Sequence, residues 1–197
     1  EGVKRAIDNF VLGCKEDGVW SAIKASCILA GARTLAGCLV PLVGAAPTNF
    51  NFVSGDYNRK TGVTGNGTSK YLNSNRKTDS DPQDNRHLVV YVNTRGTLTV
   101  NYPTWIGGTD TASNVWTLLR QGFNRSNCEA ALATNNAVAS KAGNTTGFIG
   151  TVRSSSATIT IRSGGTLQDF AQNSGTPTSV DLYVMADNLS NTARFWN

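Results

Sequence analysis

Charged residues are scarce in this sequence, in which Asp, Glu, Lys and Arg make up only 16% of 197 residues. Typical soluble domains carry about 25%. Gly, Asn, Ser and Thr take their place, a bias typical of many short strands joined by tight turns. Apolar residues still reach 39%, which argues against a disordered chain and suffices for the core of one compact domain with an appendage.

The sequence also lacks metal-binding patterns. It has one histidine, His87, and four cysteines, Cys14, Cys27, Cys38 and Cys128, with no Cys-x-x-Cys pair. A tetrahedral zinc site needs four such ligands at clustered spacing. We therefore expect no zinc, and we expect buried, reduced thiols that behave as small hydrophobic groups rather than disulfides.

Blocks of positive charge are lacking as well. The formal net charge is +5, but the densest basic patches are only the pairs Lys4-Arg5 and Arg76-Lys77. Nucleic-acid-binding proteins usually concentrate positive charge along one helix or groove. The scattered charges therefore predict a solubilising surface and no nucleic-acid partner, with weak attraction to anionic glycans as the alternative.

No long apolar run is free of helix-breaking residues. The uncharged stretch from Thr34 to Gly55 has the length of a membrane span, but prolines, glycines and asparagines interrupt it. We therefore expect no membrane insertion, and the start of the chain has no signal-peptide pattern. Because the sequence begins at Glu1 and stops at Asn197 just after an aromatic pair, we expect both ends to be cuts in a longer protein.

The first 46 residues predict a helical N-terminal segment. Apolar residues recur at helical spacing across residues 3–30, where Gly18 interrupts the pattern and Gly31 is the expected stop. We expect residues 1–46 to serve as an anchor or oligomerisation segment through their apolar face. The segment has no basic face, so we do not expect it to read DNA. The residues of that face are Ile7, Phe10, Trp20, Ile23 and Ile28.

From about residue 47 the apolar period changes to two, which predicts β-structure through residue 197. Turn residues separate the candidate strands at the spacing of a β-sandwich or jelly roll. The expected strands are Phe50–Val53, Tyr57–Val63, Thr68–Leu72, His87–Val92, Thr97–Val100, Val115–Gln121, Cys128–Ala133, Gly147–Arg153, Ala157–Arg162 and Val180–Ala186.

Three parts of this pattern carry further expectations. The turn Gly65-Asn66-Gly67 should join its flanking strands in an antiparallel hairpin. His87–Val92 is the densest apolar run and should be a central strand. The Gly- and Asn-rich stretch between Ala133 and Phe148 is either a loop or a weak edge hairpin.

Several blocks resemble concanavalin-A-like (laminin-G-type) jelly rolls in order and spacing. The early hairpin of that family is similar to Gly62-Val-Thr-Gly-Asn-Gly-Thr-Ser-Lys-Tyr71-Leu, and its central strand to His87-Leu-Val-Val-Tyr-Val92. The late hairpin is similar to Gly147-Phe-Ile-Gly-Thr-Val-Arg153 followed by Ala157-Thr-Ile-Thr-Ile-Arg-Ser-Gly-Gly165, and the next strand to Val180-Asp-Leu-Tyr-Val-Met-Ala186.

The N-terminal blocks resemble bacteriophage and prophage proteins in which a helical preface leads into a lectin-like jelly roll. These blocks are Ile7-Asp-Asn-Phe-Val-Leu-Gly-Cys-Lys15, Gly18-Val-Trp20, Ala30-Gly-Ala-Arg-Thr-Leu35 and Val40-Pro-Leu-Val-Gly44. Members are mostly regarded as virion surface or tail-appendage proteins. The resemblance implies a mainly β chain, with an antiparallel jelly-roll β-sandwich over residues 47–197 that lacks its last strand.

Aromatic residues near turns are candidates for binding sugar. Tyr102 and Trp105 lie near a predicted turn, and Asn114 stands close to Trp116 on the following strand. A pyranose ring can stack on such aromatics, although a strand tryptophan is more often part of the core. We take Tyr102, Trp105 and Asn114 as the candidate carbohydrate-binding residues.

One loop gathers carboxylates. Asp79, Asp81 and Asp84 offer the oxygen ligands that calcium accepts. The Gly and Glu positions of an EF-hand are missing, so a solvated loop is the alternative. The same residues are the nearest approach to a catalytic carboxylate pair, but none of the expected strands carries the paired carboxylates of a glycan hydrolase.

These observations lead to one expected function and two alternatives. We expect a non-enzymatic virion structural protein of a bacteriophage, a tail fibre, appendage or capsid-surface decoration that acts in assembly and host attachment. It would be made in the host cytoplasm and form a homo-oligomer on the particle, with other virion proteins and host-surface glycan as partners. A carbohydrate-binding adhesin is the first alternative and a glycan hydrolase the second. No cofactor is expected apart from calcium.

Overall fold

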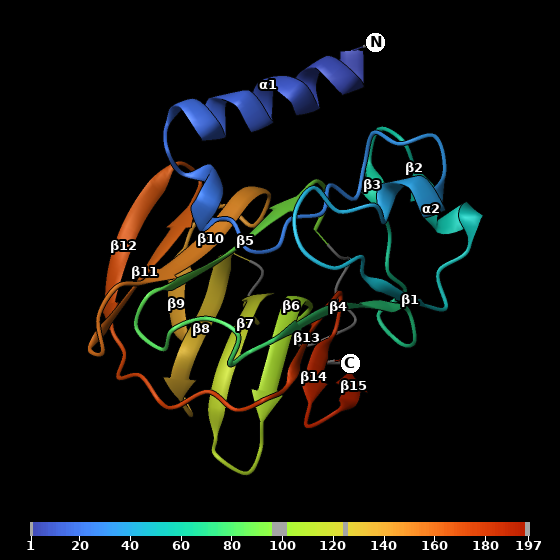
Figure 1. Ribbon diagram of the computed structural model, residues 1–197. Helices are drawn as coiled ribbons and strands as arrows, with labels where there is room; N and C mark the ends of the chain where they lie inside the picture. The colour runs from blue at the N-terminus through green and yellow to red at the C-terminus, as the bar shows by residue number, and fades with distance from the viewer. Residues whose placement is uncertain (1, 96–101, 124–125, 196–197) are drawn as a thin grey trace. The chain divides into compact units, whose positions relative to one another are not determined.

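The computed structural model describes residues 2–95, 102–123 and 126–195 of the chain (Figure 1). They form a mainly β structure of antiparallel sheets with a short N-terminal helix, as the sequence predicts. Contacts divide the chain into two compact units, the first made of residues 1–47 and 53–64 and the second of residues 48–52 and 65–197.

Helix α1 (Gly2–Glu16) opens the first unit and ends in a Schellman motif. Gly18 adopts a φ of +72°, which glycine tolerates because it has no Cβ. The amide of Gly18 donates to the carbonyl of Lys15 at 3.1 Å, and the amide of Val19 donates to that of Cys14 at 2.9 Å. The predicted interruption at Gly18 is correct, and this helix end is its cause.

The predicted second helix is wrong. After Gly18 the chain forms only a short 3-10 turn, η1 (Trp20–Ala22), and Ser26 then pairs with Val43 in an isolated β-bridge. This stretch has too few apolar residues for their spacing to distinguish a helix from extended backbone. A four-residue helix, α2 (Leu35–Cys38), follows further on.

The predicted hairpin across Gly65-Asn66-Gly67 is also wrong. In the first unit β2 (Tyr57–Asn58), which follows the 3-10 turn η2 (Ser54–Asp56), pairs instead with β3 (Gly62–Val63). Asn58 stabilises the turn between β2 and β3, because its Oδ1 accepts the amide of Lys60 at 2.8 Å. In the second unit Asn66 Oδ1 accepts the amides of residues 68–70, so this segment is a turn held by a side chain and not a strand.

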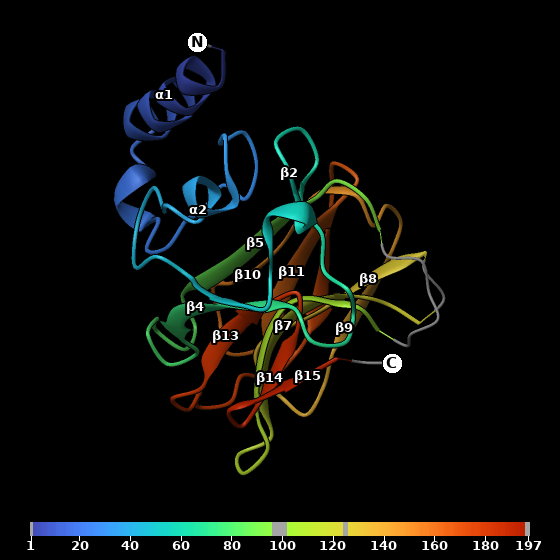
Figure 2. The ribbon, with the colours of Figure 1, turned by 90° about the vertical axis from the view of Figure 1, so that its right-hand side faces the viewer.

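The second unit consists of two sheets that face each other (Figures 1 and 2). The nine-stranded sheet has the order β1-β4-β13-β6-β7-β8-β9, with β14 paired to β6 and β15 to β14. Its strands are β1 (Thr48–Phe50), β4 (Tyr71–Lys77), β6 (Thr104–Asp110), β7 (Val115–Gln121), β8 (Asn127–Asn135), β9 (Ala139–Ala142), β13 (Asp181–Val184), β14 (Asp187–Leu189) and β15 (Thr192–Arg194). The four-stranded sheet has the order β12-β11-β10-β5, and its strands are β5 (Arg86–Val92), β10 (Gly147–Arg153), β11 (Thr158–Ser163) and β12 (Thr166–Ala171).

An apolar core fills the space between these two sheets. Ile149, Ile159 and Ile161 of the smaller sheet are fully buried, and each such side chain contributes about 1.5–3 kcal/mol on burial. Facing them from the larger sheet are Leu119, Cys128, Ala130, Leu132 and Ala139.

The structure confirms some predicted strands and corrects others. Val115–Gln121 and Gly147–Arg153 have the predicted bounds, and the edge-hairpin alternative is correct for β9. The strand His87–Val92 exists as β5, but it lies at an edge of its sheet and is not central. Strands β6, β12, β14 and β15 were not predicted, and the expected strand Thr97–Val100 lies outside the described residues.

The turn between β6 and β7 predicts a pH effect on stability. Asp110 accepts bonds from the hydroxyl of Ser113 and from the amides of Ser113 and Ala112, both at 3.0 Å. Chiefly the Ser113 hydroxyl lowers the pKa of Asp110 to about 2. Because the folded pKa is depressed, the stabilisation is present above pH 4 and is lost as pH falls toward 2.

We expect Asp110→Asn to lower the free energy of unfolding by about 1 kcal/mol at pH 7, after allowance for solvent screening. The difference from the parent chain should shrink at pH 2, where about half of the Asp110 carboxylates are protonated. Urea unfolding at pH 7, 4 and 2 measures this, with Asp17→Asn on the exposed surface as the control. An equal deficit at all three pH values would contradict the assignment.

Candidate interaction site

One face of the four-stranded sheet packs on the core, and its other face, here called the outer face, is exposed. Along β5 the burial alternates, with Leu88, Val90 and Val92 directed inward. The intervening Val89 and Tyr91 are 53% and 64% exposed. Strand β5 is therefore apolar on both faces, although only one of them meets the core.

The neighbouring strands continue this exposed apolar surface. Phe148 and Val152 of β10 are 68% and 42% exposed, and Leu167 of β12 is 68% exposed. The register places Phe148 beside Tyr91, Gly150 beside Val89, and Val152 beside His87. A monomer rarely keeps contiguous apolar side chains in water without a use for them, so this face is the leading candidate for binding.

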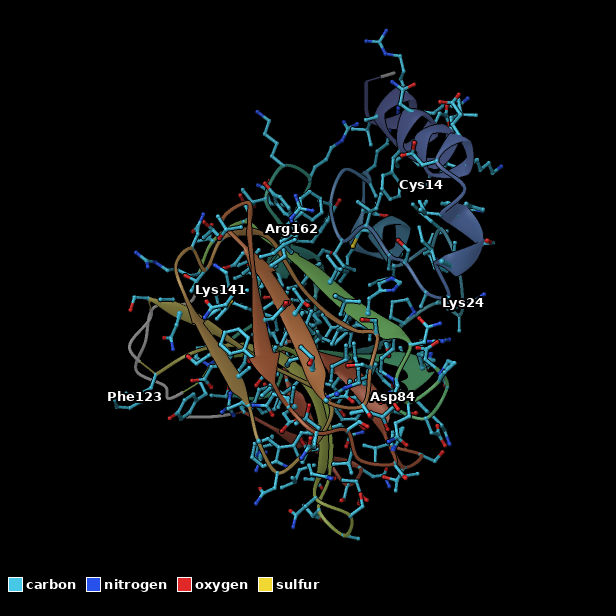
Figure 3. All side chains as sticks on the ribbon, turned by 90° about the vertical axis from the view of Figure 1, so that its left-hand side faces the viewer. Cys14, Lys24, Asp84, Phe123, Lys141 and Arg162 are labelled. Atoms are coloured by element: carbon cyan, nitrogen blue, oxygen red, sulfur yellow. The ribbon has the colours of Figure 1, made fainter. Side chains whose placement is uncertain are left out.

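The geometry of the outer face combines rings and a few polar groups. The rings of Tyr91 and Phe148 lie edge to face, 4.9 Å between centroids and 72° between planes. Gly150, between Val89 and Arg162 in the register, is buried, and a Cβ on it would lie 3.1 Å from Val89 Cγ2. Figure 3 labels Arg162 at one end of the strands of this sheet.

Polar residues flank the apolar ones on the same face. On β12 the carboxylate of Asp169 accepts a bond from the Thr160 hydroxyl at 2.5 Å, and the register aligns Thr160 with Val152 and thus with His87. The outer face therefore carries exposed apolar side chains on β5, β10 and β12, with Thr160 and Arg162 between them on β11, a carboxylate at one edge and an imidazole at the other. This mixture of apolar and polar groups suits binding to another protein surface.

The structure does not bring the predicted sugar-binding residues together. Trp105 is the second residue of β6, where a bulge lets both Trp105 and Ile106 pack against the core. Asn114 lies in the turn at the other end of β6, with a φ of +55°. Trp105 therefore works as a core residue, and it cannot share a small ligand with Asn114.

Tyr102 is engaged by charged neighbours. The guanidinium of Arg120 lies 4.3 Å from the centroid of its ring, and Arg120 Nε bonds Glu129 Oε2 at 2.8 Å. Phe123 completes the group at 5.9 Å between ring centroids. The Tyr102 ring thus has a cation–π partner within the protein.

The loop with the three aspartates is organised by an arginine. The buried guanidinium of Arg86 donates to the carbonyl oxygens of Thr78 at 2.6 Å, Pro82 at 2.8 Å and Asp81. The carboxylate of Asp81 pairs with Arg76, and no three His, Cys, Asp or Glu residues gather as metal ligands in the described ranges. A cation already occupies the place where the loop oxygens converge.

This arrangement predicts that calcium leaves the stability unchanged. A site with calcium at a hundred times its Kd would add about 2.7 kcal/mol, which a thermal melt detects easily. We expect equal melting temperatures in excess Ca²⁺ and in EGTA. A calcium-dependent rise that Asp81→Asn removes, and that Asp17→Asn keeps, would restore the calcium interpretation.

The predicted anchoring residues separate into three environments. Ile7 and Phe10 of α1 line an apolar groove of about 310 Å³ in the first unit together with Ile28. Trp20 instead lies in η1 with the Lys15 ammonium 5.9 Å from its ring, and Ile23 follows η1 in extended backbone. The single helical face predicted for all five is therefore wrong, but three of its members share one surface.

The cysteines are free thiols in differing surroundings. Burial, with a smaller effect of nearby Cys38, raises the pKa of Cys27 to about 11, and Cys27 Sγ donates to the Cys38 carbonyl at 3.2 Å. Burial also raises the pKa of Cys128, which lies in the core. Thiols protonated in this way are poor nucleophiles.

Comparisons with known proteins gave no matching family model, no matching curated protein and no matching solved structure. Among the described residues, no helix has both the length and the apolar character needed to cross a membrane. Function must therefore be inferred from the surfaces of the molecule and from the sequence.

The sequence contained one unused signal for the outer face. His87–Val92 and Gly147–Arg153 are apolar at both odd and even positions, which a strand with one solvated face does not need. For His87–Val92 this density of apolar residues predicts a central strand. In an edge strand the same pattern indicates a second apolar contact.

Proposed function

We propose that this chain is a non-enzymatic structural protein of a bacteriophage virion, which works in assembly and attachment through the outer face of its four-stranded sheet. The proposal rests on the exposed apolar side chains of this face, which are Val89, Tyr91, Phe148, Val152 and Leu167. Such a surface binds by buried apolar area and shape and needs no catalytic group. The link to a virion rests on the resemblance of the N-terminal blocks to phage proteins.

We further propose that the second unit is a concanavalin-A-like jelly roll. The chain crosses between the two sheets from β4 to β5, from β5 to β6, from β9 to β10 and from β12 to β13. Repeated crossing between two antiparallel sheets is what a jelly roll requires. The early hairpin on which the resemblance partly rested is not formed, so the support comes from the β5, β10 and β11 blocks.

Mass spectrometry of particles purified from a producing culture tests the proposed function. We expect the chain in the particles at a stoichiometry of many copies, and a lower copy number for Phe148→Ser, which removes one exposed ring without touching the core. Thr146→Ser, a conservative change at a half-buried position just before the same strand, is the control. Particles that lack the chain would contradict the proposal.

Carbohydrate binding is the second candidate, because Tyr91 and Phe148 lie on the same face as Arg162 and Asp169. Sugar rings stack on aromatic faces, and guanidinium and carboxylate groups bond their hydroxyls. If the outer face binds glycan, Tyr91→Ala should abolish signal on a glycan array and Trp105→Ala, in a folded variant, should not. A silent array for the parent chain would remove this candidate.

A further inference from the structure

We infer that the outer face binds the outer face of a second copy of this chain, in a two-fold dimer whose axis runs along the strands between β10 and β11. This inference rests on the proposed function, because it names the partner of the same surface. It follows from the order of residues across the sheet, which makes the face complementary to itself.

The strand register arranges the outer face in rows. One row runs His87, Val152, Thr160, Asp169, and the next runs Val89, Gly150, Arg162, Leu167. Strand β5 supplies the first member of each row and β12 the last. The order of residues along each row thus reads from an imidazole or valine at one edge to a carboxylate or leucine at the other.

A two-fold axis parallel to the strands places each row of one copy against the same row of the second copy, running in the opposite direction. His87 then lies opposite Asp169 of the second copy, and Val89 lies opposite Leu167 of the second copy. Both contacts occur twice, as an isologous interface requires. An imidazole meets a carboxylate in the first row, and two aliphatic side chains meet in the second.

In the middle of the second row, Gly150 lies opposite Arg162 of the second copy. The ring of Phe148, two residues along β10, can then receive the guanidinium as a cation–π partner. Sheets that pack face to face cross at about 30°, and rows close to the axis keep this alignment.

The area of the face fits a modest dimer. Four strands about 4.8 Å apart, with about six residues rising 3.3 Å each, cover on the order of 400 Å² of flat surface. Because projecting side chains add to the flat area, two copies would together bury about 1,000 Å² of accessible surface, which is the lower end for specific interfaces. We expect a dimer with a Kd on the order of micromolar.

A second copy fits this surface better than a glycan does. The Tyr91 and Phe148 rings are 72° apart, so they do not form one flat platform for successive sugar rings. The exposed Val89, Val152 and Leu167 of this face are aliphatic, and such side chains pack against protein and give sugar hydroxyls no bonds. The face is therefore built for contact with another apolar surface.

Sedimentation equilibrium of the full chain over a concentration series tests the inference. We expect a monomer–dimer equilibrium in which Phe148→Ser weakens association about tenfold or more. His87→Glu, which places a second carboxylate opposite Asp169, should weaken it to a similar degree. Adding Asp169→Lys to His87→Glu should restore the affinity to within about threefold, because opposite charges meet again.

Asp17→Lys, the same charge change on an exposed residue of the first unit, is the matched control and should leave association unchanged. Circular dichroism checks that every variant is folded. A parent chain that stays monomeric would overturn the dimer, whether or not it binds glycan through Tyr91. A double variant that dimerises no more tightly than His87→Glu would overturn it as well. The particle measurement is independent, so the dimer can fail while the virion assignment holds.

Discussion

Replacing Arg153 by leucine is expected to lower the free energy of unfolding by about 3–5 kcal/mol. Arg153 is the largest side chain with no exposed surface in the second unit. Its Nε donates to the Leu132 carbonyl at 2.6 Å and its Nη1 to the Gln172 carbonyl at 2.8 Å. Leucine would leave these acceptors buried without a donor.

Arg153 has one further contact to the larger sheet and one just after its own strand. Its Nη2 donates to Thr134 Oγ1 of β8 at 2.9 Å, and its Nη1 also donates to the Ser155 carbonyl at 3.1 Å. Burial lowers the pKa of the Arg153 guanidinium, and the Asp84 carboxylate opposes that effect. Asp84 Oδ1 is itself buried with no hydrogen-bond partner among the described residues, so the loss of the positive charge would leave it less well compensated.

Urea unfolding measures the loss, which corresponds to a melting temperature roughly 10 °C lower for a chain of this size. Arg153→Lys keeps the charge but not the planar fork of donors, so we expect an intermediate loss. Arg5→Leu on the exposed side of α1 should change stability by no more than about 0.5 kcal/mol. A variant Arg153→Leu as stable as the parent would show that these acceptors find water instead.

The fold class was predictable from the sequence because it depends on local preference. Scarce charge, abundant Gly, Asn, Ser and Thr, and a period of two are properties of short segments. They gave Val115–Gln121 and Gly147–Arg153 with the observed bounds. Pairing partners depend on residues far apart in the chain, so the hairpin at Gly65-Asn66-Gly67 and the central position of β5 were wrong.

The candidate site was hidden by the same limit. Tyr91 belongs to a run predicted as a central strand and Phe148 to a predicted hairpin strand, whereas the sugar-binding prediction chose Trp105 because it lies near a predicted turn. Alternation alone cannot say which face of a strand meets a second sheet. Likewise, Arg86 and Arg153 stand at strand ends in the sequence, and only the folded chain shows both guanidinium groups buried.

Strand β6 was not predicted because Gly107-Gly108 reads as a turn, yet this pair is where the larger sheet branches. Tyr183 of β13 and Asp187 of β14 both pair with Gly107. A Cβ on Gly108 would lie 3.0 Å from the Asp181 carbonyl oxygen and 3.0 Å from Thr78 Cγ2. The two glycines therefore allow neighbouring strands to approach closely. In the sequence alone, the same pair suggests a flexible turn.

We expect Gly108→Val to lower the free energy of unfolding by about 3 kcal/mol, the upper range for overpacking. The nearest atom is a backbone oxygen that also accepts Asn188 Nδ2 at 2.8 Å, so relief requires moving β13 and breaking that bond. Gly55→Val is the matched control, because no atom lies within 4 Å of its Cβ position. Equal urea midpoints for the two variants would mean that β13 shifts at little cost. A selective loss at Gly108 would show that the branch holds the larger sheet in place behind the core, on which the inner face of the four-stranded sheet packs.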